Sequence, residues 1–103
     1  MVIMKPLQIV EHPIFSEWLD KQTDRKLIAM ILNRLDQVKA GNLGDHCQIA
    51  DVHGLAELRI HYGPGYRIYY TMREREIVIL LCAGDKSEQK RSIKRAKLMV
   101  QEV

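Results

Sequence analysis

The sequence predicts an α+β domain in which a helical hairpin near the N-terminus lies on one side of an antiparallel β-sheet and a basic helix follows near the C-terminus. Two stretches with helical spacing of apolar residues come first, and two alternating runs around a Gly-Pro-Gly turn follow. A continuous apolar run then precedes a last helical stretch. With 103 residues, of which 47% are hydrophobic, residues 1–103 predict a single domain with one core.

The chain begins with a predicted strand and a short helix. Residues 6–10 are an apolar run that fits a strand, and it ends at His12 because Pro13 restricts the residue before it. Helical spacing then indicates a short helix around Trp18, a side chain that we expect in the core rather than on a stacking surface. The apolar stripe of this helix comprises Ile14, Phe15, Trp18 and Leu19.

A second, longer helix completes the helical hairpin. Thr23 or Asp24 can cap its start, and Gly41 and Asn42 end it after about Lys39. Its predicted buried stripe comprises Leu27, Ile28, Ile31, Leu32, Leu35 and Val38.

The stretch ELRIHYGPGYRIYY predicts a β-hairpin at residues 57–70. With a three-residue loop at 63–65, Tyr62 would lie opposite Tyr66 and His61 opposite Arg67, and the other pairs would follow in step. Since side chains alternate along a strand, one face would carry Leu58, Ile60, Tyr62, Tyr66, Ile68 and Tyr70 and cover a core. The other face would carry Arg59, His61, Arg67 and Tyr69. A bulge in the loop would exchange the faces of one strand, and the clean separation argues against it.

The remaining elements flank this hairpin. Residues 47–49 fit a short edge strand, and the β-branched run at 77–83 is typical of a strand covered on both faces, which we expect at the centre of the sheet. Ser87 stands where the cap of a last helix would be. The inner face of that helix would carry Ile93, Ala96, Lys97 and Val100, and its outer face Lys90, Arg91, Lys94 and Arg95.

Composition excludes several classes of protein. We find no apolar run that approaches the roughly 20 residues of a membrane span and no secretory signal at the start, so we expect a cytoplasmic protein. Cys47 and Cys82 have no short spacing and are expected to be free thiols. The four histidines show no metal-ligand spacing, and no metal or cofactor is expected.

Positive charge is concentrated in the second half of the chain. The net charge is only +3, but from Arg59 onward ten Lys and Arg residues face five Asp and Glu residues, which leaves +5. Such an asymmetry suggests a polyanionic or acidic partner, although basic helices are often simply solvated.

Three ordered motifs carry a resemblance to a known family. These are GNLGD at 41–45, the hairpin sequence, and LLCAGDKSEQKRSIKRA at 80–96. Together with the order of elements, they resemble the RelE/ParE superfamily of bacterial toxins, and within it the HigB-like "addiction module killer protein" branch. The resemblance implies a RelE-like fold and the toxin of a type II toxin-antitoxin system. It further implies a cognate antitoxin as partner, operator DNA contacted only through that antitoxin, and ribosome-dependent cleavage of mRNA without a metal.

Four residues are candidates for the chemistry that the resemblance implies, three from the polar face of the hairpin and one from the segment after residues 77–83. Arg67 matches the arginine of the family's GYR motif, and its planar fork suits two phosphate oxygens. Arg59 would hold an adjacent phosphate or the charge of the transition state. His61 suits proton transfer, and Lys86 stands where the family places a functional basic residue. The alternatives are a solvated sheet face, an exposed histidine without a role, and a lysine solvated at a helix start.

RNA contacts are expected from two further places. Tyr69 would stack a base of the codon or pack across the strands on Arg59. Lys90, Arg91, Lys94 and Arg95 would bind ribosomal RNA or face the antitoxin. Some ribosome-dependent relatives carry a catalytic tyrosine in the last helix, whereas this chain has no tyrosine after Tyr70.

Two other functions remain open at this point. ParE-like members of the superfamily share the fold but inhibit DNA gyrase by binding, without chemistry of their own. A toxin that has lost its activity would still bind its antitoxin. That partner could lay an amphipathic helix beside the helical hairpin or add a strand to the sheet edge.

Overall fold

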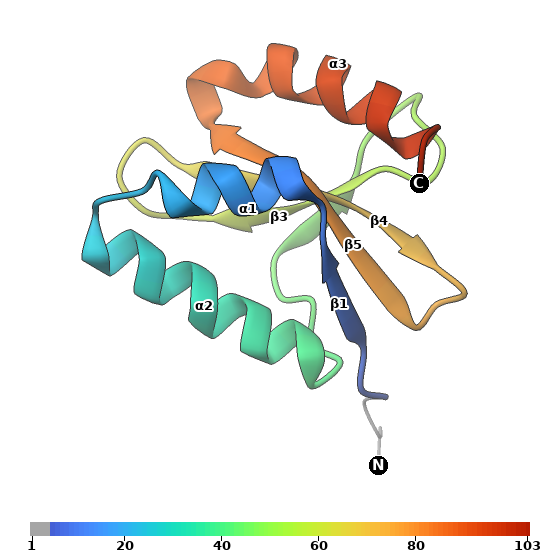
Figure 1. The fold of residues 1–103 in the computed structure, drawn as a ribbon, viewed down its shortest axis with the longest axis horizontal. Helices are drawn as coiled ribbons and strands as arrows, with labels where there is room; N and C mark the ends of the chain where they lie inside the picture. Colours follow the sequence, from blue (N-terminus) through green and yellow to red (C-terminus); the bar gives the residue numbers. More distant parts are fainter. Residues whose placement is uncertain (1–4) are drawn as a thin grey trace.

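The computed structural model describes residues 5–103, so the first four residues of the predicted domain lie outside the description. It is a mixed α+β fold with a five-stranded sheet and three α-helices (Figure 1). The elements are β1 (Gln8–Glu11), α1 (Pro13–Asp20), α2 (Arg25–Lys39), β2 (His46–Gln48), β3 (Ala56–Ile60), β4 (Tyr66–Arg73), β5 (Ile77–Asp85), a 3₁₀ turn (Lys86–Glu88) and α3 (Gln89–Val100). No described helix is long and apolar enough to cross a membrane.

The strands follow the order β1-β5-β4-β3-β2 across the sheet. β1 runs parallel to β5, and the other neighbours are antiparallel. The middle strand is therefore β4, and the expectation that residues 77–83 form the centre is wrong by one strand. The parallel β1 takes the outer place beside β5, which shifts the centre to the second strand of the hairpin.

The sheet separates two apolar clusters instead of covering the single core that we expected. The first cluster joins one face of the sheet to α1 and α2 and includes Phe15, Leu27, Leu58 and Leu80. The second joins the other face to α3 and includes Leu55, Leu81, Ala96 and Met99. In Figure 1, α2 and α3 lie on opposite sides of the strands. As predicted, β5 is buried on both of its faces.

The helical hairpin forms as predicted, with one exception in its stripe. Asp24 caps α2 by accepting the backbone N–H groups of Lys26 and Leu27. Four of the six stripe residues are buried, namely Leu27, Ile31, Leu35 and Val38, and Ile28 is half-buried. Leu32, in contrast, is 49% exposed. It lies about 100° around the helix from Ile31, on a side of α2 that turns away from the sheet.

The β3–β4 hairpin has a longer loop than the sequence predicts. Ile60 pairs with Tyr66 and Arg59 with Arg67, so the loop spans the five residues 61–65. The predicted register is thus wrong by two residues, and a shift of two leaves both faces unchanged. Tyr62 lies in the loop, and its hydroxyl donates a hydrogen bond of 2.8 Å to Asp24 at the cap of α2. Gly63 and Gly65 close the turn with φ of 55° and 85°.

A bulge in β5 changes which side chains face which cluster. Tyr69 pairs with Cys82 and Tyr70 with Leu80, so Leu81 has no partner on β4. Leu81 and Cys82 consequently both face the second cluster. Beyond the bulge, Gly84 stands opposite Arg67.

The last helix begins differently from the prediction. Ser87 is not the cap: Asp85 caps the 3₁₀ turn that precedes α3, since its carboxylate accepts the N–H of Ser87 and the side chain of Glu88 accepts the N–H of Asp85, while Glu88 stands at the start of α3 without a side-chain cap bond. Ser87 lies inside the 3₁₀ turn. Extra residues in this turn rotate α3, so that Ser92, Ala96 and Met99 are buried. Ile93 and Val100 are half-buried, and Lys97, which was expected inside, is exposed.

Arg34 ties α2 to the loop before β2 and to the end of β3. Its guanidinium donates to the carbonyl oxygens of Leu43 at 3.0 Å and of Arg59 at 2.8 Å, and also to that of Asp45. Gly44 passes so close that a Cβ there would lie 2.7 Å from Arg34 Nε. The planar group therefore satisfies three carbonyls from two separate segments.

We predict that Arg34→Ala lowers the free energy of unfolding by about 2–4 kcal/mol, since three carbonyls lose a charged donor. Urea unfolding followed by circular dichroism measures the loss. Arg25→Ala, which removes the same charge from an exposed position of α2, is the matched control and should change stability little. Equal stability of the two variants would show that the three bonds contribute nothing.

Candidate functional site

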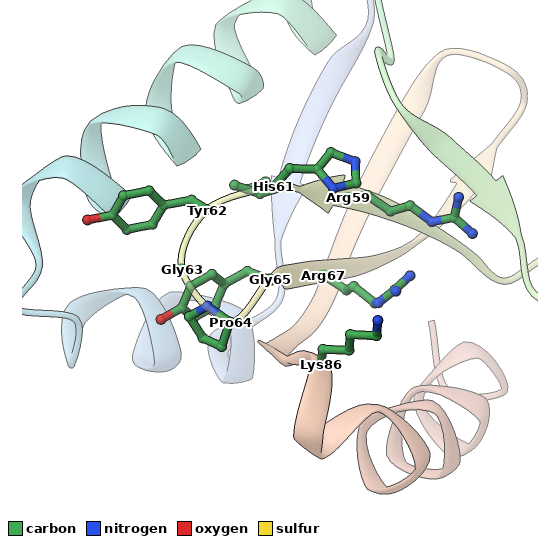
Figure 2. Close-up of a pocket in the computed structure, with 10 residues that line it drawn as sticks. Arg59, His61, Tyr62, Gly63, Pro64, Gly65, Arg67 and Lys86 are labelled. Carbon is green, nitrogen blue, oxygen red and sulfur yellow. The ribbon is translucent and has the colours of Figure 1, made fainter.

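An open pocket of about 430 Å³ lies at the turn end of the β3–β4 hairpin (Figure 2). Arg59 lines it from β3, His61 from the hairpin loop, Arg67 from β4, and Lys86 from the 3₁₀ turn after β5. Figure 2 shows Arg59, Arg67 and Lys86 extending to the same side of the hairpin, while Tyr62 points the other way. The four candidate catalytic residues thus lie around one pocket, which we call the arginine pocket.

A buried carboxylate that sequence reasoning missed joins the two arginines. Glu57 Oε1 accepts hydrogen bonds from Arg67 Nη1 at 2.9 Å and from Arg59 Nε at 3.2 Å. The Glu57 side chain is only 3% exposed. Residues 57 and 59 share a face of the strand because they are two apart, and this parity was the signal that could have revealed Glu57.

The two arginines differ in exposure. Arg67 is 16% exposed and Arg59 is 36% exposed, so neither is the freely solvated residue of a bare sheet face. On β5, the residue paired with Arg67 is Gly84, which has no side chain. The hydrogen bond to Glu57 raises the pKa of Arg59 above its ordinary value, which keeps this group charged. Each guanidinium also has N–H groups that Glu57 does not use.

His61 is held by a second acidic residue that the sequence analysis did not select. Its Nε2 lies 2.5 Å from Asp45 Oδ2, and this hydrogen bond is the main cause that lowers the pKa of Asp45. Asp45 is the last residue of the GNLGD motif, and Arg34 holds its backbone carbonyl. The ring is therefore oriented by a carboxylate, and Nδ1 is the nitrogen available for another contact.

Lys86 lies against the hairpin turn without an acidic partner. Its backbone N–H donates to the carbonyl of Gly65 at 2.9 Å, which fixes the start of the 3₁₀ turn beside the pocket. Its side chain is exposed, and within residues 5–103 it forms no ion pair. Lys86 thus adds a positive charge to the pocket that no carboxylate offsets.

Tyr69 is not available to stack a base, contrary to one of our two expectations. It is 1% exposed and belongs to the second apolar cluster, beneath α3. Burial raises the pKa of Tyr69 to about 12, and its hydroxyl has no hydrogen-bond partner among the described residues. The sequence analysis places Tyr69 on the correct face of the hairpin, but α3 covers the part of this face that lies away from the turn.

The basic residues of α3 form a separate surface. Lys90, Arg91, Lys94 and Arg95 are exposed, and none of them lines the arginine pocket. Arg91 pairs with Glu88 at 2.9 Å on the surface, where such a bond contributes little. This surface can meet a polyanion without occupying the pocket.

Comparison with known proteins gives two matches. Residues 17–102 match the family described as "Phage derived protein Gp49-like (DUF891)". A protein of Haemophilus influenzae, described as uncharacterized, is 42% identical over 97 residues, which are 94% of this chain and 96% of that protein. The family match begins within α1 and continues past the end of α3, so it includes the hairpin and every residue of the arginine pocket.

We predict that Tyr69→Phe leaves stability at pH 7 unchanged or raises it by about 1 kcal/mol, because it removes a buried hydroxyl without a partner. Above pH 10 the variant should be the more resistant protein. The unfolded chain releases the tyrosine proton near 10 and the folded chain only at about 12, so wild-type stability falls as the pH rises through this window. Urea unfolding at neutral pH and between pH 10 and 12 measures both effects. A strongly destabilised variant would mean that the hydroxyl has a partner.

Proposed function

The chain belongs to the Gp49-like family of phage-derived proteins, and on this premise we propose that it is the toxin of a type II toxin-antitoxin system. In this proposal it is a HigB-like member of the RelE/ParE superfamily that cleaves mRNA on the ribosome, and a cognate antitoxin neutralises it. The observation that carries the proposal is the grouping of two arginines, a lysine and a carboxylate-bound histidine around one open pocket.

The proposed reaction breaks the RNA backbone with its own 2′-hydroxyl group. The 2′-oxygen loses its proton and forms a bond to the adjacent phosphorus, while the bond from phosphorus to the 5′-oxygen breaks. The products are a 2′,3′-cyclic phosphate and a 5′-hydroxyl end. The reaction needs a base for the first proton, cations for the extra negative charge, and a proton or cation for the leaving oxygen.

The arginine pair supplies the cations. Glu57 fixes both guanidiniums through one oxygen, so their remaining N–H groups are oriented before any ligand arrives. Two carboxylates face the two guanidiniums, since Asp45 Oδ1 also lies 3.9 Å from Arg59 Nη1, and Lys86 then adds a positive charge that no carboxylate pairs with. In the proposal, Arg67 binds the scissile phosphate and Arg59 the transition-state charge or a neighbouring phosphate.

His61 and Lys86 would divide the proton transfers. Asp45 holds the imidazole at Nε2, which leaves Nδ1 to exchange a proton with the 2′-hydroxyl or the leaving oxygen. Lys86, on the opposite side of the pocket mouth from His61, would neutralise the other oxygen (Figure 2). This assignment needs no metal and no tyrosine from α3.

Primer extension on a defined mRNA tests the proposal, with the purified protein added in the presence and absence of programmed ribosomes. A gyrase supercoiling assay runs in parallel. Cuts that appear only with ribosomes support the proposal, whereas cuts in free RNA would keep the chemistry and reject the ribosome as partner. Intact mRNA together with inhibited gyrase would establish the ParE-like alternative instead.

We predict that Arg67→Ala lowers the cleavage rate at least about 10²-fold and abolishes growth arrest, since the phosphate loses its oriented donor. Arg73→Ala removes the same group from the far, exposed end of β4 and should retain the activity. Because Arg67 also pairs with Glu57, thermal unfolding must show that the variant is folded, and Arg67→Lys, which keeps the charge without the fork, should also be slow. A folded Arg67→Ala protein with the wild-type rate would refute the mechanism.

We further predict that the basic surface of α3 contributes phosphate contacts to ribosome binding. A variant with Gln at positions 90, 91, 94 and 95 should bind ribosomes more weakly, and the salt dependence of its binding should decrease by roughly one unit of slope per lost contact. A control with Gln at positions 21, 25, 39 and 75 removes the same charge elsewhere. If both variants keep the wild-type slope, the α3 surface must serve another partner, such as the antitoxin.

A further inference from the structure

A second hollow of about 300 Å³ lies between α2 and the end of β3. Met30, Asn33, Arg34 and Gln37 line it from α2, and we call it the α2 groove. Its other wall consists of Arg59, Ile60 and His61, which also line the arginine pocket. The two hollows therefore adjoin each other, and a ligand in one can extend into the other.

The α2 groove is open because β2 is short. β2 pairs with β3 only as far as Leu58, so the edge of β3 beyond that residue has no neighbouring strand. The backbone groups of Arg59 at this edge are already bonded, because Arg34 donates to the Arg59 carbonyl at 2.8 Å and the Arg59 N–H donates to the carbonyl of Asp45 at 2.9 Å. The guanidinium of Arg34 is thus a fixed wall of the groove, and the edge offers little to an added β-strand.

The exposed wall of the groove presents two amides to solvent. Asn33 and Gln37 stand four residues apart and thus on one face of α2, and both are exposed. Neither side chain forms a hydrogen bond within residues 5–103. Each amide has a donor and an acceptor side by side, which is the pattern that reads the edge of a nucleobase. Met30 is half-buried and adds apolar surface for the flat side of a base, whereas Ile60 behind the hollow is only 4% exposed.

We infer that the α2 groove binds a nucleobase of single-stranded RNA, next to the phosphate held by the arginine pocket. The inference rests on the proposed function and adds a source of sequence preference to it. Single-stranded RNA is recognised through unstacked bases whose edges are hydrogen-bonded, and phosphate contacts alone carry no sequence information. Arg59 belongs to both hollows, so one strand can place a phosphate and the neighbouring base in the two sites together.

A protein segment fits this groove less well than a base does. An amphipathic helix needs a row of apolar anchors, and the groove supplies only Met30 and Ile60. Its remaining walls are amides and cations that would have to be desolvated.

The test uses uncleavable 2′-O-methyl trinucleotides that differ in the central base and the nuclear magnetic resonance signals of the side-chain amides. Addition of the trinucleotides should shift the Asn33 and Gln37 amide signals. The affinity ratio between the best and the worst central base should fall about tenfold in the double variant Asn33→Ala, Gln37→Ala. Gln101→Ala, which removes an exposed amide far from both hollows, should leave the ratio unchanged.

Three results would overturn the inference. These are amide signals that stay in place while the arginine signals move, a base preference that survives in the double variant, and amide signals that move only with the purified antitoxin. Cleavage mapped by primer extension distinguishes a failure of this inference from a failure of the proposed nuclease function. A double variant that cuts at the wild-type rate but at different bases supports both. A wild-type protein that cuts no RNA refutes the nuclease, while the trinucleotide titration still decides what the groove binds.

Discussion

The Glu57 carboxylate lies almost fully buried between β3 and β4, and the geometry of the arginine pocket depends on it. A buried charge is costly unless it is paired, so Glu57 must keep a guanidinium beside it. Both Arg59 and Arg67 fulfil this requirement through the same oxygen. The pair is thereby held at a fixed spacing, and its charge is only partly neutralised. A site for an anion thus exists before the anion binds.

The position of α3 gives the two halves of the hairpin face different roles. Near the turn, Arg59, His61 and Arg67 remain accessible. Further along the strands, α3 covers Tyr69 and completes the second apolar cluster. The close approach is possible because Gly84 lies under the helix, where a Cβ would be 3.0 Å from Ser92 Oγ. The same helix carries the basic surface, so the site and that surface are fixed relative to each other by packing.

Sequence reasoning found most elements and the correct faces of the two hairpin strands, because periodicity depends only on backbone geometry. It placed Arg59, His61 and Arg67 together for the same reason, whereas Lys86 was selected only from the family resemblance. It missed what depends on distant parts of the chain. The longer loop brings Tyr62 to Asp24 of another element, and the burial of Tyr69 follows from the placement of α3. Arg34 binds backbone carbonyls, and Asp45 reaches His61 from the loop before β2. A local sequence pattern gives no signal for either contact.

The bulge at Leu81 also determines how the chain tolerates changes in length. Leu81 is the extra residue of β5, since its neighbours on both sides are already paired with consecutive residues of β4. A homologous chain that lacked only this residue could keep every existing pair, with the loss of one buried side chain. Removal of Cys82 or Ala83 would instead move Gly84 away from Arg67 unless the bulge itself disappeared. Position 81 is thus a place where β5 can lose one residue in evolution while Arg67 stays paired with Gly84.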